Sequence, residues 1–109
     1  MTTKFISRSE EYILLAVLYL EKEAYGVSIR QQLKRMTGET WSFGAVFVML
    51  NRMEKKGYCL SRLADPTPRR GGKSKRIFSL TPEGLDELKR IKNIHSGAWK
   101  KAAAVSLLK

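Results

Sequence analysis

The sequence has too few cysteines and histidines for an internal disulfide or a structural metal site. Its 109 residues include one cysteine, Cys59, and one histidine, His95. A disulfide takes two cysteines, and a structural zinc ion takes four Cys or His ligands. We therefore expect no metal and no cofactor. A lone thiol also suits a reducing compartment, so we expect a cytoplasmic protein.

Long apolar runs and catalytic constellations are missing as well. The sequence has no run of 18 or more apolar residues that could span a bilayer, and residues 1–9 lack the apolar centre of a signal peptide. It has no paired carboxylates with a histidine, no phosphate-binding glycine loop before a lysine, and no cluster of metal ligands. We therefore expect a protein that is not an enzyme and has no catalytic residues.

Acidic residues are scarce relative to basic ones. The chain has 21 Lys and Arg against 10 Asp and Glu, which gives a net charge of +11 and a pI of about 10.1. Such an excess indicates a polyanionic partner, either nucleic acid or an anionic membrane surface. No expected helix has an apolar face opposite a dense basic one, so we expect nucleic acid as the partner and no membrane. The length indicates a single domain.

Basic residues concentrate in the segment 69–76, Arg-Arg-Gly-Gly-Lys-Ser-Lys-Arg, which has five cations and no acid. Gly71 and Gly72 suit the tip of a hairpin, because glycine adopts positive φ at little cost. Alternating residues predict one strand within 58–64 and a second at 76–80. The result is a β-hairpin with a cationic tip, suited to phosphate. A merely solvated charged loop remains the alternative.

Capping residues and apolar spacing predict two helices at the start of the chain. The residues Ser-Arg-Ser-Glu at 7–10 have the spacing of a capping box, which opens a largely buried helix that ends at 21–23. A second helix follows the connection at 24–26. Gly38 is its natural stop.

A third helix is predicted from about Phe43 to Lys56, behind Ser42 as the N-cap. Val46 and Leu50, with Met53 one turn on, mark its inward face. Gly57 would end it in a left-handed conformation.

The segment Thr-Pro-Glu at 81–83 predicts a last helix that could extend about 27 residues, to Lys109. Its apolar stripe is narrow and rich in small residues. A helix that projects from a small domain cannot bury such a stripe on its own core, so we expect a homodimer. We predict a DNA-binding core at 1–80 and a dimerisation helix at 81–109, which form one compact unit. The predicted interface residues are Leu88, Ile91, His95, Ala98, Trp99, Ala102 and Val105.

Three helices, a two-stranded wing and a terminal helix make a winged helix-turn-helix, and three stretches resemble the PadR family of transcriptional regulators. They are 24–29, with Ala-Tyr-Gly and Ile29; 42–57, with Ser-Phe-Gly-Ala-Val-Phe and Arg-Met-Glu; and 71–84, from Gly-Gly-Lys to Thr-Pro-Glu-Gly. The resemblance extends over about 11–88. It implies an α+β, mainly α fold with a long C-terminal dimerisation helix.

The chain departs from the family pattern at three positions of the third helix. Phe43, Ala45 and Phe47 stand where the family usually has proline, threonine and tyrosine. The change at Phe47 keeps the ring but removes a hydroxyl that could bond a phosphate. These departures bear on the operator sequence more than on the fold.

The resemblance implies a DNA-binding transcriptional regulator, most readily a dimeric repressor that reads an inverted repeat with its third helix in the major groove of double-stranded DNA. The apolar outer face of that helix keeps open a sequence-nonspecific nucleic-acid binder, architectural or RNA-binding. Arg30, Lys34 and Arg35 could contact flanking DNA or be solvated. The predicted DNA-binding residues are Ser42, Phe43, Ala45, Phe47, Val48, Asn51, Arg52 and Lys55 in the helix, and Arg69, Arg70, Lys73, Lys75 and Arg76 in the wing.

Some relatives bind flat aromatic compounds between their terminal helices. The resemblance therefore allows a small aromatic effector at Trp99. Packing within a dimer interface is the more common role for a tryptophan.

Overall fold

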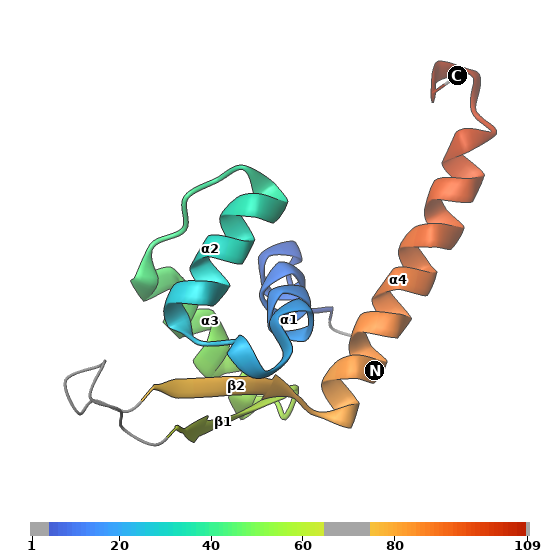
Figure 1. The fold of residues 1–109 in the computed structure, drawn as a ribbon. Helices are drawn as coiled ribbons and strands as arrows, with labels where there is room; N and C mark the ends of the chain where they lie inside the picture. Colours follow the sequence, from blue (N-terminus) through green and yellow to red (C-terminus); the bar gives the residue numbers. More distant parts are fainter. Residues whose placement is uncertain (1–4, 65–74, 109) are drawn as a thin grey trace.

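The computed structural model describes residues 5–64 and 75–108. In chain order the elements are α1 (Arg8–Leu20), η1 (Glu21–Glu23), α2 (Gly26–Thr37), α3 (Phe43–Lys55), β1 (Cys59–Leu63), β2 (Arg76–Leu80), α4 (Pro82–Ala103) and η3 (Ser106–Leu108) (Figure 1). This is the mainly helical winged-helix architecture that the sequence predicts. None of the helices in the described ranges is long and apolar enough to cross a membrane.

The predicted starts of α1 and α3 and the predicted end of α2 are confirmed by their caps. The Oγ of Ser7 accepts from the backbone N–H of Glu10 (3.1 Å), and a Glu10 oxygen accepts from the N–H of Ser7 (2.8 Å), which completes the capping box of α1. Gly38 ends α2 with φ of 76°. Ser42 caps α3 by accepting from the N–H of Ala45 at 3.1 Å. Each signal acts within four residues, so it is legible in sequence.

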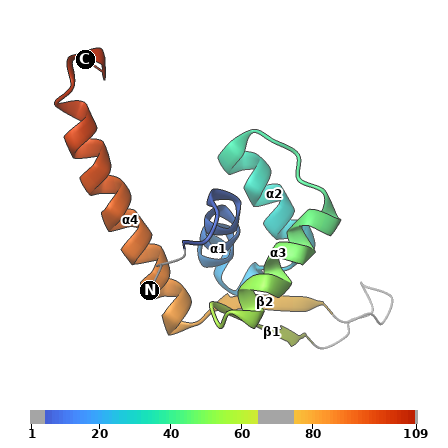
Figure 2. The same ribbon diagram turned by 180° about the vertical axis from the view of Figure 1, so that it is seen from behind.

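The wing is a two-stranded antiparallel sheet beside α3. Cys59 lies opposite Leu80, and Leu63 lies opposite Arg76. On its other edge β2 meets the end of η1, where the N–H of Phe78 donates to the carbonyl of Ala24 at 2.7 Å. Figure 2 shows the wing from behind, running under α3. The predicted hairpin tip lies within 65–74, outside the described residues.

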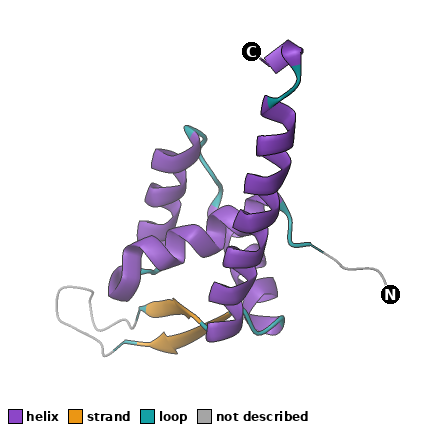
Figure 3. Cartoon of the chain, turned by 90° about the vertical axis from the view of Figure 1, so that its right-hand side faces the viewer, coloured by secondary structure: helices purple, strands orange, loops and turns teal. Residues whose placement is uncertain are grey.

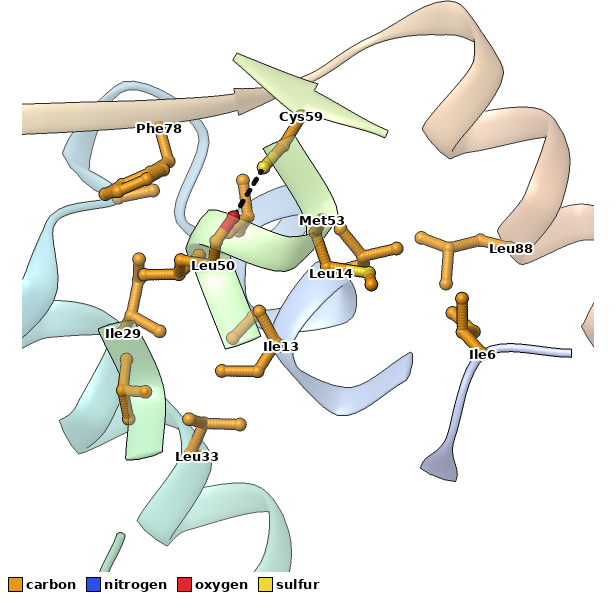
Figure 4. Packing of buried hydrophobic residues seen from close by; sticks show 14 of the residues in the cluster. Ile6, Ile13, Leu14, Ile29, Leu33, Leu50, Met53, Cys59, Phe78 and Leu88 are labelled. Carbon is orange, nitrogen blue, oxygen red and sulfur yellow. Dashed lines mark hydrogen bonds between the residues drawn. The ribbon is translucent and has the colours of Figure 1, made fainter. Parts of the chain in front are cut away.

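The core lies between α1, α2, α3 and the inner face of the wing. The ring of Phe78 is fully buried with aliphatic side chains from all three helices (Figure 4). The Sγ of Cys59 lies 3.8 Å from the carbonyl oxygen of Leu50, and burial raises the pKa of this thiol to about 11. The thiol therefore acts as a small apolar group, and a thiolate is disfavoured.

The first turns of α4 also belong to this core. Gly84 lies so close to the chain at Tyr58 that a Cβ would fall 2.0 Å from the Tyr58 carbonyl oxygen. Leu88 and Ile91, which the sequence analysis places in a dimer interface, are instead buried in the core of their own chain, where Leu88 lies near Ile6 (Figure 4). The apolar spacing alone could not distinguish an intrachain contact from an interchain contact, since both need the same stripe.

The C-terminal part of α4, beyond the contact of His95 with Glu11 of α1, extends away from the rest of the chain (Figure 3). It ends at Ala103, shorter than the predicted helix to Lys109, and the short η3 follows. The N–H groups of Ala104 and Val105 donate three residues back, to Lys101 and Ala102, rather than four. This tightening of the last turn is a common way for a helix to end, and no capping signal in the sequence marks it.

Candidate nucleic-acid interface

The helix α3 presents an outward face opposite its buried residues. Val46, Leu50 and Met53 are buried, so the helix is rotated as the sequence predicts. The centre of the opposite face is formed by exposed Val48, Asn51 and Lys55, and the exposed residues over the whole helix include Ser42, Phe43, Ala45, Val48, Asn51, Arg52 and Lys55. A helix with such a free face can enter a major groove.

Little of this face is charged. Ala45 and Val48 are exposed and can make only apolar contact, for example with a thymine methyl group. Ser42 already uses its Oγ to cap the helix. Hydrogen bonding to base edges from the centre of the face therefore depends on Asn51 and Lys55.

On one flank of α3, Arg52 is tied to α1. Its Nη1 donates to Oε2 of Glu10 at 3.1 Å. Burial alone would raise the pKa of Glu10, but hydrogen bonds from the backbone N–H of Ser7 and from Arg52 outweigh it and lower that pKa. The carboxylate stays charged and holds Arg52, whose side chain remains half exposed. Arg52 thus positions α3 against α1, whatever contact its exposed side makes.

On the other flank, Arg76 ties the wing to α3. Its Nη2 lies 2.7 Å from Oε1 of Glu54, its Nη1 3.0 Å from Oδ1 of Asn51, and its Nε 3.0 Å from Oγ of Ser61. The hydroxyl of Ser61 donates in turn to Glu54 at 2.9 Å. Arg76 was predicted as a DNA contact, but the structure places it in this intramolecular network. All the acceptors it meets here come from the chain itself.

Two other predicted contact residues also have partners within the chain. Phe47 is half-buried and packs against Gly26. A Cβ added to Gly26 would lie only 2.7 Å from Cζ of the Phe47 ring. The Lys75 ammonium lies 3.8 Å from the centre of the Tyr25 ring. These cation–aromatic and edge contacts steady the start of α2 beside α3 and the wing.

Arg30 on α2 behaves similarly, because its guanidinium lies 4.5 Å from the centre of the Phe43 ring. Its neighbours Lys34 and Arg35 are exposed. Arg69, Arg70 and Lys73 lie outside the described residues.

The sequence analysis missed Glu54, Ser61 and Glu10 as partners of the DNA-facing cations. Glu54 is the only acidic residue of α3. An acidic residue in a helix that is expected to face DNA indicates that its carboxylate pairs with a nearby cation of the same chain. The identity of that cation could not be read locally, because 22 residues separate Glu54 from Arg76 and 42 separate Glu10 from Arg52.

The distal half of α4 carries the rest of the predicted interface. Ala98, Trp99 and Val105 are exposed, and Trp99 keeps 62% of its surface accessible. A shallow hollow of about 190 Å³ is lined by His95, Ala98, Trp99 and Ala102. His95 also approaches Glu11 of α1, with 3.8 Å between Nε2 and Oε1. Among residues 5–64 and 75–108, no three Cys, His, Asp or Glu side chains gather to hold a metal ion.

Solved structures of several regulators share this fold. A PadR-like transcriptional regulator from Bacillus cereus has a TM-score of 0.71 at 21% identity, with 88% of each chain covered. A PadR family regulator from Clostridium difficile has a TM-score of 0.65 at 26% identity, covering 87% of this chain and 94% of that one. An organohalide-sensing regulator in its ligand-free form has a TM-score of 0.66 at 17% identity, covering 91% of this chain and 52% of that one.

The sequence itself gives the decisive comparison. No curated protein matches the chain significantly. The family model described as the transcriptional regulator PadR-like family matches residues 14–90, which include α2, α3, both strands of the wing and the start of α4. With a free α3 face and a basic balance of charge, the chain is a DNA-binding transcription regulator rather than an enzyme, and it belongs to the PadR-like family of transcriptional regulators.

Proposed function

We propose that the chain is a dimeric repressor that reads an inverted repeat with α3 in the major groove and the wing on the adjacent backbone. The observation that carries the proposal is the exposed face of α3, whose two flanks are held by Arg52–Glu10 and Arg76–Glu54. A helix fixed on both sides can present Val48, Asn51 and Lys55 in one orientation. The net charge of +11 supports backbone contacts around it.

The distal half of α4 supports the dimer. A stripe with Ile94, Ala98 and Trp99 is exposed on the part of α4 that projects from the core, and Val105 is exposed just beyond the end of α4. Burying such a stripe against its symmetry mate would form a two-helix seam at little entropic cost, because the helix is already formed. In a two-fold dimer the two α3 helices would reach half-sites one helical turn apart, about 34 Å. The proposed division is a DNA-binding core at 1–80 and a terminal helix at 81–109, whose first turns pack on that core and whose distal half makes the dimer contact. We place the protein in the cytoplasm.

A small aromatic effector is proposed to bind beside Trp99. The hollow beside Trp99 offers an exposed indole and small alanines, which suit a flat ring. One structurally similar regulator is described as organohalide-sensing, which supports looking for a small-molecule effector. An effector bound there would release DNA by favouring a spacing of the two α3 helices that does not fit the operator.

Selection of genomic DNA fragments by the purified chain at about 150 mM salt tests the function, because surface charge is appreciably screened there. We expect retained fragments to share an inverted repeat upstream of a gene. Random fragments with no shared repeat would instead establish the general nucleic-acid binder, which the apolar centre of α3 favours. Sedimentation equilibrium on the same sample tests the dimer.

A further inference from the structure

We propose that Arg76 is a positioning residue that orients the Asn51 amide, so that Asn51 reads the operator as a hydrogen-bond donor and favours guanine over adenine. The inference rests on the proposed function, in that α3 reads base edges. It assigns Arg76 to shaping the reading helix rather than to binding a phosphate.

The geometry of the guanidinium carries the first step. Arginine has five N–H donors in a planar fork. Here each of the three nitrogens has an acceptor within 3.0 Å, and the acceptors come from two different elements: Glu54 and Asn51 on α3 and Ser61 on β1. The Ser61 hydroxyl closes the network by donating to Glu54. A planar fork held at three points has little freedom to turn toward DNA.

The second step concerns the Asn51 amide. Only its oxygen can accept from Arg76, so the 3.0 Å contact from Nη1 settles which end of the amide faces the wing. The side-chain NH₂ is left as the end available for a base. A guanidinium has five N–H donors, so Arg76 also competes with a base for the second lone pair of Oδ1.

The third step is the chemistry of the base edges. Asparagine reads adenine by accepting from N6 and donating to N7 at the same time. An amide whose oxygen is engaged by Arg76 keeps the donor half of that pair and loses much of the acceptor half. Guanine presents two acceptors, O6 and N7, in the major groove. Asn51 is exposed near the centre of the outward face of α3, where a base edge would lie.

The test compares base preferences and salt dependence among variants. Wild-type protein is first used to select from a randomised duplex pool, and substitution of alanine for Asn51 identifies the base pair that this residue reads. We expect a guanine preference there of about tenfold, which Asn51→Ala abolishes. The double variant Glu54→Gln/Arg76→Met removes the network while leaving the net charge unchanged. It should lose the discrimination against adenine at that pair and no other.

Salt titration separates positioning from phosphate contact. The slope of log K against log salt should stay at the wild-type value in the double variant, whereas loss of one phosphate contact would reduce its magnitude by about 0.9. Lys55→Gln, which removes one exposed charge from the same helix, calibrates the size of that reduction. Cooperative thermal unfolding of each variant verifies that it is folded.

Arg76→Lys supplies a second and gentler test. It keeps the charge but cannot hold three acceptors in one plane, so we expect the altered preference at the Asn51 base pair with an unchanged slope. A wild-type preference in Arg76→Lys, together with a reduced slope in the double variant, would overturn the inference and make Arg76 a phosphate contact. If the wild-type chain itself selects no shared sequence, the proposed function fails instead.

Discussion

The two halves of α4 belong to one continuous helix but have opposite environments. In the first half, Gly84, Leu88 and Ile91 are buried against α1, β2 and the chain at Tyr58. In the second half, Ile94 and Trp99 remain exposed, and Gly97 has open space around it. Hydrophobic periodicity therefore indicates only that one face of a helix is apolar. Whether that face is buried in its own chain or left exposed differs between the two halves of this 22-residue helix.

The largest contrast should come from the two glycines of this helix. Gly84→Ala places a methyl group 2.0 Å from the Tyr58 carbonyl oxygen, so the start of α4 must move off the core. We expect a loss of about 3 kcal/mol or more in the free energy of unfolding, a large share of the stability of a small domain. Urea unfolding followed by circular dichroism measures it.

Gly97→Ala is the matched control in the distal half. A Cβ there meets nothing within 4 Å, and alanine is the better helix former, so this variant should gain up to about 1 kcal/mol. Equal destabilisation by both changes would mean that the two halves are packed alike.

The next largest contrast separates apolar side chains. Leu88→Ala should lower the unfolding free energy by about 2–3 kcal/mol, because Leu88 is only 6% exposed and the methylenes removed leave a cavity. Ile94→Ala removes a half-exposed side chain and should cost much less. Thermal unfolding over a series of protein concentrations distinguishes the two side chains. The stabilisation from a dimer contact decreases on dilution, whereas the stabilisation from an intrachain core contact is independent of concentration. A Leu88→Ala effect that disappears on dilution would contradict the intrachain assignment.

Acid should act on the first half of α4 and spare the second. Hydrogen bonding from Arg90 lowers the pKa of Glu87 below its ordinary value of 4.5, so the folded state holds this carboxylate charged. Its contribution is present above about pH 4.5 and is lost as pH falls through the lowered pKa. Glu87→Gln should therefore show a flatter decline of stability in acid than the wild-type chain. Residues 92–109 include no acidic side chain to titrate there.

Trp99→Ala should have the smallest effect on the stability of a single chain, within about 0.5 kcal/mol, because its side chain is largely exposed. Its effect on association should be much larger, with a dissociation constant raised about tenfold or more. Sedimentation equilibrium of both proteins measures the difference. Unchanged association would place the dimer contact elsewhere on the chain.

Much of the interface predicted from sequence is placed on the expected face, but several of its cations have other partners. Ser42, Val48, Asn51 and Lys55 are exposed along α3 as predicted. Arg52 and Arg76 also lie at this face, and each is engaged by a carboxylate of the same chain. Charge alone could not separate these roles, because a cation suits a phosphate and a carboxylate equally well.

The sequence by itself determined the order of the main helices and strands of this protein and most of their ends, but not the C-terminal end of α4. The capping box at Ser7 and Glu10, the stop at Gly38, the caps at Ser42 and Thr81, and the strand at 76–80 all act through neighbours within four residues or through an alternation visible in the strand itself. Such signals involve only local backbone geometry and hydrogen bonding, so reading them requires no knowledge of the fold.

The tertiary structure decided which side chains meet. Arg76 meets Asn51, and Arg52 meets Glu10, across 25 and 42 residues of chain. Leu88 and Ile91 are buried in the core of their own chain, while Trp99 is exposed. These outcomes depend on how α3, α4 and the wing pack around one core. Long-range partners are fixed by that packing, and no pattern confined to a single helix or strand can specify them.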